Sequence, residues 1–354
     1  MKSRVLINSI FVMLFCFAAL SAGNKKPLNI IFMIGDGMGF NHIQAALTVS
    51  GNKLFMSDFP YTGIQKTHSL NDYITDSPAG GTALACGVKT NNGIIGMSPD
   101  SVHLCSILLK AEEMKLSTGI VTTCNLTHPT PAAFYAHAGD RLMTEQIATW
   151  FPKSGIDIAI GGGINDFERR KDNRNISEEL RKSGYQVLYS MDDAKQRKSG
   201  NLLVLLAEDH PKKVSEGRDY LPLAVDMAIK RLSLNKKGFF LMVEGSQIDW
   251  GGHQNDQNYV VSETIDFDKA VGRALEFAKK DGNTLVIVTA DHETGGTSIQ
   301  TGSFKDQNVT ILFDTKGHSG APVPVFSYGP GAENFSGWFE NVAFKSKITD
   351  IMRW

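Results

Sequence analysis

The sequence predicts an α/β fold, in which a central, mostly parallel twisted sheet has helices on both faces. Short continuous apolar runs of strand length alternate with longer stretches of helical period, which is typical of βαβ units. The 34 glycines gather after apolar runs, where tight turns between strands and helices need them. No linker, internal repeat or low-complexity stretch divides the chain. We therefore expect a single domain over residues 23–354.

Residues 1–22 are predicted to be a secretory signal peptide. Basic residues precede an apolar run at 5–20, which small residues follow, and this is the order of such a signal. A membrane anchor is the alternative, but the run is a little short for a span. Lipid attachment at Cys16 is disfavoured, because Phe15 takes the place of the small residue that precedes a lipidated cysteine. We expect a periplasmic or secreted protein with no membrane span after signal removal.

The expected elements follow the apolar pattern along the chain. Continuous apolar runs predict buried strands, at residues 28–34, 119–123, 156–160, 202–207, 239–243, 284–289 and 323–327. Helical patterns fall between several of them, including residues 104–114, 223–232 and 260–279. The polar region 166–200 is expected to form helical surface.

The stretch 73–96 is predicted to form a short strand, a tight turn and a helix of small residues. Ser77 is placed as the N-cap of this helix and Pro78 as its first residue, positions that these residue types favour. The small residues that follow leave backbone N–H groups open, so the helix N-terminus could bind an anion. A serine hydroxyl there could attack phosphorus. The alternative is that Ser77 only caps the helix.

Charge and cysteine content narrow the class of protein. The net charge of −1, without a block of like charges, gives no support for nucleic-acid binding. The cysteines beyond the signal are Cys86, Cys105 and Cys124. Three cysteines allow at most one disulfide, and their spacing matches no zinc–thiolate motif.

Acidic residues and histidines collect where the predicted strands end. In open α/β sheets, ligands bind beyond the carboxyl ends of the strands. An acid buried there is costly unless it is paired or bound to a metal. Asp249 and His253 are four residues apart, which places them on one face of a helical turn. Imidazole with carboxylate suits zinc, whereas oxygen ligands alone suit magnesium. The remaining members of the set are Asp36, Glu244, Asp291, His292, Glu293 and His318.

The motifs around these residues resemble those of alkaline phosphatases over residues 29 to about 337. They are Gly-Asp-Gly-Met-Gly at 35–39, Thr-Asp-Ser-Pro-Ala-Gly-Gly-Thr-Ala at 75–83, Thr-His-Pro-Thr-Pro-Ala-Ala-Phe-Tyr-Ala-His at 127–137, Val-Glu-Gly-Ser-Gln-Ile-Asp at 243–249 and Thr-Ala-Asp-His-Glu-Thr-Gly-Gly at 289–296. The resemblance implies a three-layer sandwich of the alkaline phosphatase type. It also implies a homodimer that hydrolyses small-molecule phosphate monoesters.

The resemblance further implies two Zn²⁺ ions and one Mg²⁺ ion. One zinc would be held by Asp249, His253 and His318. The second would be held by Asp36, Asp291 and His292, with Ser77 completing it in the free enzyme. The magnesium would be held by Asp36, Thr130 and Glu244. Arg141 matches the arginine that clamps phosphate, and the reaction would pass through a covalent phosphoserine on Ser77.

Two positions depart from the best-known bacterial members of the family. His128 stands in place of an aspartate, and Trp250 stands in place of a lysine. A histidine near the third metal site could admit zinc instead of magnesium. Trp250 offers phosphate no positive charge, so the product could leave faster; the alternative is that Trp250 only packs.

Two other functions stay open at this point. A phosphodiesterase or sulfatase on the same fold would share the metal-rich strand ends. However, Ser77-Pro78-Ala79-Gly80 is not the sulfatase motif, and those enzymes usually lack a counterpart of Arg141. A secreted phosphate- or metal-binding protein that has lost catalysis is the alternative from another class. The complete set of predicted ligands and the serine argue against it.

Overall fold

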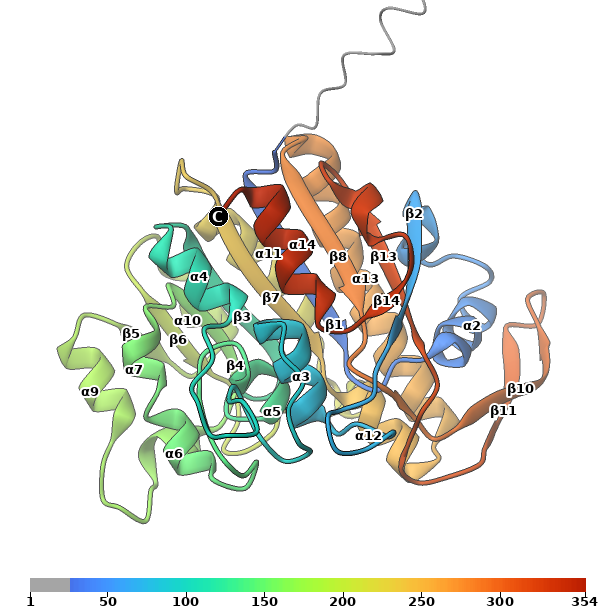
Figure 1. Cartoon of the computed structure of the whole chain (residues 1–354), viewed down its shortest axis with the longest axis horizontal. Helices are drawn as coiled ribbons and strands as arrows, with labels where there is room; N and C mark the ends of the chain where they lie inside the picture. Colours follow the sequence, from blue (N-terminus) through green and yellow to red (C-terminus); the bar gives the residue numbers. More distant parts are fainter. Residues whose placement is uncertain (1–25) are drawn as a thin grey trace, which may run out of the picture.

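The computed structural model describes residues 26–354, so the predicted signal peptide lies outside the described residues. Its centre is a ten-stranded sheet in the order β14-β2-β13-β8-β1-β7-β3-β4-β6-β5 (Figure 1). Every neighbouring pair is parallel except the two pairs that β13 makes with β2 and β8. The strands are β1 (Asn29–Gly35), β2 (Tyr61–Lys66), β3 (Ser117–Asn125), β4 (Ile158–Gly162), β5 (Gln186–Leu188), β6 (Leu202–Leu205), β7 (Phe239–Gly245), β8 (Thr284–Thr289), β13 (Val323–Tyr328) and β14 (Gly337–Glu340).

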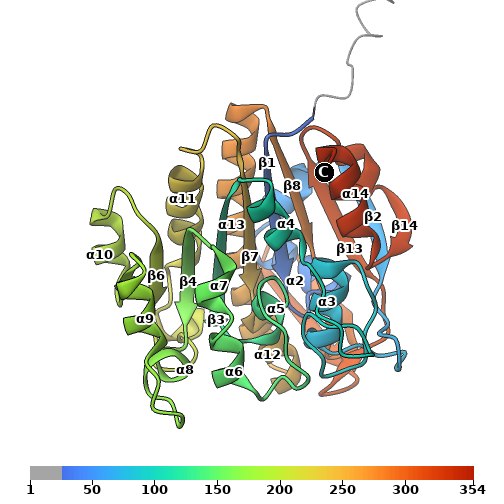
Figure 2. The same cartoon turned by 60° about the vertical axis from the view of Figure 1, so that its left-hand side comes forward.

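Helices cover both faces of this sheet, so the predicted fold class is confirmed. Figure 2 shows α3, α4 and α14 on one face and α11 and α13 on the other. Successive side chains of β1 point to opposite faces of the sheet, so Phe32 packs in one core cluster and Met33 in the other. The helices are α2 (Phe40–Val49), α3 (Ser77–Cys86), α4 (Ile107–Glu113), α5 (Pro129–Ala132), α6 (Thr144–Ala148), α7 (Phe151–Ser154), α8 (Ile164–Glu168), α9 (Ile176–Lys182), α10 (Met191–Gln196), α11 (Leu221–Leu232), α12 (Gln247–Gln254), α13 (Gln257–Asp281) and α14 (Ala343–Met352).

The four central strands β8, β1, β7 and β3 bring their carboxyl ends to one edge. The register pairs Ile34 with both Glu244 and Thr289, and it pairs Thr122 with Glu244. All residues of β1, β7 and β8 are buried, because both faces of these strands are covered. Polar side chains that follow these strands therefore meet at the same place.

Several elements differ from the sequence prediction. The strand expected just before Ser77 is absent, and residues 166–200 contain the strand β5 among three short helices. The strands β2 and β14 carry no continuous apolar run, since both are partly exposed near the sheet edge. An antiparallel hairpin, β10 (Thr297–Ser303) with β11 (Asn308–Phe313), also lacks one. The apolar pattern of the sequence therefore does not predict these strands.

Within residues 26–354, no helix combines the length and the apolar character that a membrane span requires. The three cysteines of this part of the chain are all free. Cys86 and Cys124 are buried, and Cys105 is exposed.

Candidate active site

Helix α3 carries Ser77 in its first turn. Its N-cap is Asp76, whose Oδ1 accepts a hydrogen bond from Ala79 N at 3.0 Å. The prediction that Ser77 is the cap and Pro78 the first helical residue is therefore wrong, since Ser77 itself is the first. The second oxygen of Asp76, Oδ2, accepts a hydrogen bond from Gly93 N at 2.7 Å, which holds the capping side chain in place. The Ser77 hydroxyl consequently makes no capping bond.

The Ser77 hydroxyl lies against the first group of predicted metal ligands. Its Oγ is 3.2 Å from His292 Nε2. The same nitrogen lies 3.4 Å from Asp36 Oδ1 and 3.4 Å from Asp291 Oδ2. All four side chains are buried. They come together because β1 and β8 are neighbours, and Asp36 follows one while Asp291 and His292 follow the other.

A second group surrounds Asp249 on α12. Asp249 Oδ2 lies 3.3 Å from His253 Nε2, and Asp249 Oδ1 lies 3.5 Å from His318 Nε2. The two imidazole Nε2 atoms are 3.2 Å apart. His318 belongs to the short bridge β12 (His318–Ser319), and its ring stacks on His292 at 3.6 Å between centroids. The stack joins the two groups into one centre.

The residues predicted for magnesium adjoin this centre. Thr130 on α5 donates a hydrogen bond to Asp36 Oδ2 at 3.2 Å. Glu244 lies near the end of β7 and is fully buried. His128 Nδ1 is 4.0 Å from Glu244 Oε1. Asp36 thus lies between the His292 group and the Thr130 hydroxyl.

The pKa values of most of the buried acids show that their ionised forms are unfavourable in the protein without bound metal. Burial and the nearby acids raise the pKa of Asp36, and they raise that of Asp291 to about 8. Burial also raises the pKa of Glu244. Burial would do the same to Asp249, but its hydrogen bond with His253 and the neighbouring imidazoles hold its pKa below the usual range. Such a cluster needs compensating positive charge.

The unpartnered atoms of the cluster match what divalent cations bind. Asp36 Oδ1, Glu244 Oε1 and Asp291 Oδ2 are buried and have no hydrogen-bond partner among the described residues. Buried polar atoms in native proteins are nearly always satisfied. Carboxylate oxygens and imidazole nitrogens are ligands for zinc, and carboxylate and hydroxyl oxygens are ligands for magnesium. The residues present therefore fit bound metal ions.

Arg141 and two aromatic rings border the centre. Arg141 is half-buried in the loop between α5 and α6, and its charge opposes the rise that burial causes in the pKa of Asp36. Trp250 on α12 is half-buried, with its ring centroid 6.1 Å from that of His128. His210 packs against Trp250 at 4.7 Å and accepts a hydrogen bond from a backbone N–H at the end of β3. Burial lowers the pKa of His128 to about 3, helped by the Arg141 charge.

Sequence reasoning missed several residues of this region. Thr122 donates to Glu244 Oε2, and Cys124 Sγ lies 3.4 Å from the same oxygen. Thr294 donates to Asp249 Oδ1. Thr122 and Cys124 stand at the carboxyl end of β3, so the rule that located the acids could have found them. No sequence pattern indicates His210, because it lies in an exposed loop that is distant in sequence from both His128 and Trp250.

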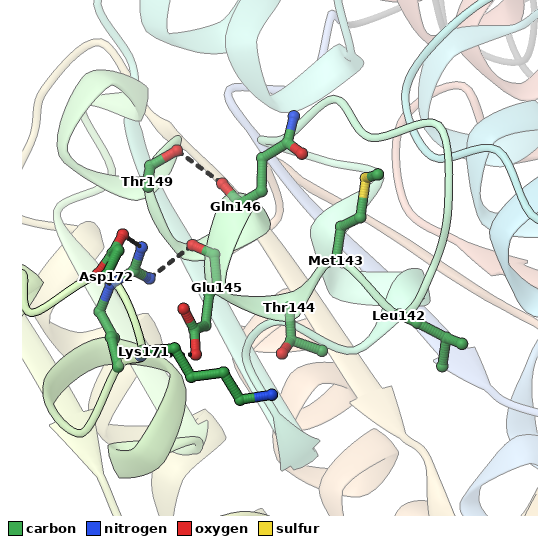
Figure 3. A pocket seen from close by; sticks show the side chains of 9 residues that line it. Leu142, Met143, Thr144, Glu145, Gln146, Thr149, Lys171 and Asp172 are labelled. Carbon is green, nitrogen blue, oxygen red and sulfur yellow. Dashed lines mark hydrogen bonds and ion pairs between the residues drawn. The ribbon is translucent and has the colours of Figure 1, made fainter.

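A separate cavity of about 490 Å³ lies beside the loop that follows Arg141 (Figure 3). Its wall contains the ion pair of Arg170 with Asp172, and Arg170 also donates to the Glu145 carbonyl oxygen. None of the predicted metal ligands lines it. The chemistry of the site therefore lies elsewhere, at the strand ends.

The fold and the site together define a class of protein. A serine at a helix N-terminus, set among buried carboxylates and imidazoles at the carboxyl edge of a parallel sheet, is typical of a metal-dependent hydrolase with a serine nucleophile. A family model described as Alkaline phosphatase matches residues 27–310.

Similar proteins point the same way. Alkaline phosphatase 4 of Bacillus subtilis (strain 168) is 42% identical over 306 residues, which cover 81% of this chain and 66% of that protein. Alkaline phosphatase of Escherichia coli (strain K12) is 33% identical over 398 residues, covering 90% of this chain and 84% of that one. The solved alkaline phosphatase from the Antarctic bacterium TAB5 is 40% identical with a TM-score of 0.89, covering 93% and 99%. The chain belongs to the alkaline phosphatase family, and it is a metal-dependent phosphomonoesterase.

Proposed function

We propose that the protein hydrolyses phosphate monoesters through a covalent phosphoserine on Ser77. The observation that supports this most directly is the position of the Ser77 hydroxyl, 3.2 Å from His292 Nε2 and without a capping hydrogen bond. In the first step the Oγ–P bond forms and the P–O bond to the alcohol breaks; the proton of the serine hydroxyl passes to solvent, and the departing alkoxide takes a proton from solvent. In the second step a water oxygen attacks phosphorus, the Oγ–P bond breaks, and one proton of the water restores the serine hydroxyl as inorganic phosphate is released.

The open N-terminus of α3 and the guanidinium of Arg141 hold the phosphate during both steps. Arg141 presents a planar fork that matches two phosphate oxygens. The backbone N–H groups of the first turn favour the charge that develops on the equatorial oxygens. Arg141 also favours a monoester over a diester, since a diester has one charged oxygen fewer for it to bind.

We propose two Zn²⁺ ions and one Mg²⁺ ion, held by the groups whose geometry is given above. The first zinc would take Asp249, His253 and His318, the second would take Asp36, Asp291, His292 and Ser77, and the magnesium would take Asp36, Thr130 and Glu244. The chemistry that bound metal supplies is a lowered pKa for the serine hydroxyl and charge stabilisation on the leaving oxygen.

His128 and Trp250 are proposed to tune the third metal site and phosphate release. Two solved variants of the TAB5 enzyme, in which one histidine is replaced by glutamate or by aspartate, hold Mg in a site called M3. By analogy we expect His128→Asp to raise the affinity of this chain for Mg²⁺. Trp250→Lys is expected to tighten the binding of phosphate, measured as a lower inhibition constant.

The first experiment compares release of p-nitrophenol from p-nitrophenyl phosphate and from bis-p-nitrophenyl phosphate. We expect a strong preference for the monoester at alkaline pH, loss of turnover on chelation, and recovery when zinc and magnesium are added back. Ser77→Ala serves as the control and should lose at least about 10³-fold in kcat. Preference for the diester would instead indicate a phosphodiesterase of the same fold. Turnover of neither substrate by the zinc-loaded protein would indicate a binding protein.

Export and assembly are further parts of the proposal. We propose that the chain is secreted or periplasmic, after cleavage near residue 22, and that it forms a homodimer. The support is the resemblance to the family and the order of residues in the first part of the sequence. The N-terminal residue of the mature protein and its mass by light scattering would test the two statements separately.

A further inference from the structure

The Glu244 carboxylate has neighbours besides Asp36 and Thr130. Cys124 Sγ lies 3.4 Å from Glu244 Oε2, and His128 Nδ1 lies 4.0 Å from Glu244 Oε1. The three donor atoms of this group lie within 4.8 Å of one another. They converge because β3 and β7 are paired with Thr122 opposite Glu244, while His128 begins the turn that leads into α5.

This group is buried and incompletely satisfied. Cys124 and Glu244 are 0% exposed and His128 is 9% exposed. Glu244 Oε1 and His128 Nδ1 face each other, yet neither has a hydrogen-bond partner among the described residues. Buried polar atoms are nearly always paired, so two adjacent ones without a partner are what a cation-binding site would present. The thiol beside them is a soft donor.

We propose that Cys124, His128 and Glu244 form a binding site for a thiophilic divalent cation such as Zn²⁺ or Cd²⁺. Ligands on tetrahedral zinc are separated by about 3.5 Å, since zinc binds sulfur at about 2.3 Å and nitrogen or oxygen at about 2.0 Å. Cys124 Sγ already lies at this separation from one oxygen of Glu244, at 3.4 Å from Oε2, whereas His128 Nδ1 lies 4.0 Å from the other oxygen, Oε1. The three donors, which lie within 4.8 Å of one another, must therefore move closer together around the ion. A fourth position is left for solvent. Binding converts the thiol to a thiolate, so one proton is released to solvent for each ion bound.

The site shares Glu244 with the proposed magnesium ligands, and its His128 is the residue proposed to tune that magnesium site; Cys124 is the ligand that it adds. Magnesium prefers an all-oxygen set and is not expected to use the thiol. A hard ion such as Mg²⁺ would thus bind Glu244 together with Asp36 and Thr130, and a soft ion would bind Glu244 together with Cys124 and His128. The single carboxylate makes the two positions mutually dependent. This assignment does not depend on phosphatase turnover, so it can be examined in a Ser77→Ala background.

The test titrates metal-free protein with Cd²⁺ and follows the near-ultraviolet thiolate-to-cadmium absorption band. Cys86→Ser and Cys105→Ser are matched controls, one for a buried and one for an exposed cysteine. We expect the band in the parent protein and in both controls, and its loss in Cys124→Ser. The affinity of this site for Cd²⁺ should fall at least about tenfold in Cys124→Ser, while the affinity for Mg²⁺ should change by less than about twofold. The number of protons released when an ion binds at this site should be lower by one in Cys124→Ser than in the parent protein.

X-ray absorption of the zinc-loaded protein gives an independent readout. We expect a sulfur scatterer at about 2.3 Å in the parent protein, and none in either Cys124→Ser or Cys124→Ala. Thermal unfolding of the two variants checks that both fold. A band that persists in Cys124→Ser would overturn the proposal. So would saturation of the parent protein with no thiolate band, or a band that disappears only in Cys105→Ser.

Discussion

Asp76 shows how one side chain fixes the position of the serine. Its two carboxylate oxygens accept hydrogen bonds from Ala79 N in the first turn of α3 and from Gly93 N in the following loop. The Ser77 hydroxyl is thereby released from capping and can face His292. A serine in the role of cap would have used its oxygen on the backbone, and the hydroxyl proposed as the nucleophile would not have been free to face His292.

Replacing Asp76 by alanine tests this role. We expect Asp76→Ala to lower the free energy of unfolding by about 1–2 kcal/mol, the usual cost of losing an N-cap. It should also lower kcat, since Ser77 is no longer held against His292. Asp76→Asn keeps one of the two acceptor oxygens and should lie between the parent protein and Asp76→Ala. Urea unfolding and steady-state kinetics measure the two effects, and an unchanged kcat in Asp76→Ala would contradict the positioning role.

At the scale of elements, α4 and β3 meet through an acidic contact far from the metal centre. The Thr118 hydroxyl donates to Glu112, and Asp157 accepts from Thr118 N at 2.8 Å. Burial, and to a lesser degree Asp157, raise the pKa of Glu112 to about 7. The folded state therefore binds a proton that the unfolded state has already released. This contribution to stability is present at low pH and is lost as the pH rises toward and through 7.

Glu112→Gln should remove that pH dependence. At pH 8 the variant should be more stable than the parent protein by about 1 kcal/mol, a value reduced from the full shift because Glu112 is only partly buried. At pH 5 the two should differ little. Urea unfolding at both pH values, with metals held constant, measures the difference. An equal difference at pH 5 and pH 8 would show that packing rather than ionisation is responsible.

The elements that could be predicted from the sequence are those whose residues are buried on both sides. β8 was predicted with its observed bounds, and β1, β7 and β3 within a few residues, because a short continuous apolar run between turn residues is typical of a buried strand. β2 and β14 could not be found this way, since half-exposed strands are stabilised by neighbours rather than by their own pattern. The contact of His210 with Trp250 could not be predicted either, because the course of the loop that carries His210 brings the two rings together and no sequence pattern records it.

At the scale of the whole molecule, the fold concentrates negative charge at the edge where its central strands end. Asp36, Glu244, Asp249 and Asp291 are all buried there. Their closeness follows from the strand order, not from any local preference. Positive charge from bound metal lowers this cost, so stability and metal content are linked.

Chelation should therefore destabilise the protein. A site occupied at about 100 times its Kd adds about 2.7 kcal/mol to stability, so removing the metals should lower Tm by at least about 5 °C. The pKa of Asp291, raised by burial to about 8, gives the direction with pH. Without metal, stability is lost as the pH rises through 8, so the decrease in Tm should be larger at pH 9 than at pH 6. Differential scanning calorimetry with metal added back is the measurement, and a Tm insensitive to chelator would contradict the linkage.

The burial of α3 has a consequence for the timescale on which the serine can move. All ten residues of this helix are buried, and apart from Leu84 their side chains are small. The backbone amides beyond the first turn of such a helix are hydrogen-bonded and shielded from solvent, so their hydrogens should exchange with deuterium slowly. The helix that carries the proposed nucleophile, Ser77, would then be among the slowly exchanging parts of the chain. Substrate entry and product release would have to rely on the motion of other parts, such as the loop that carries Arg141.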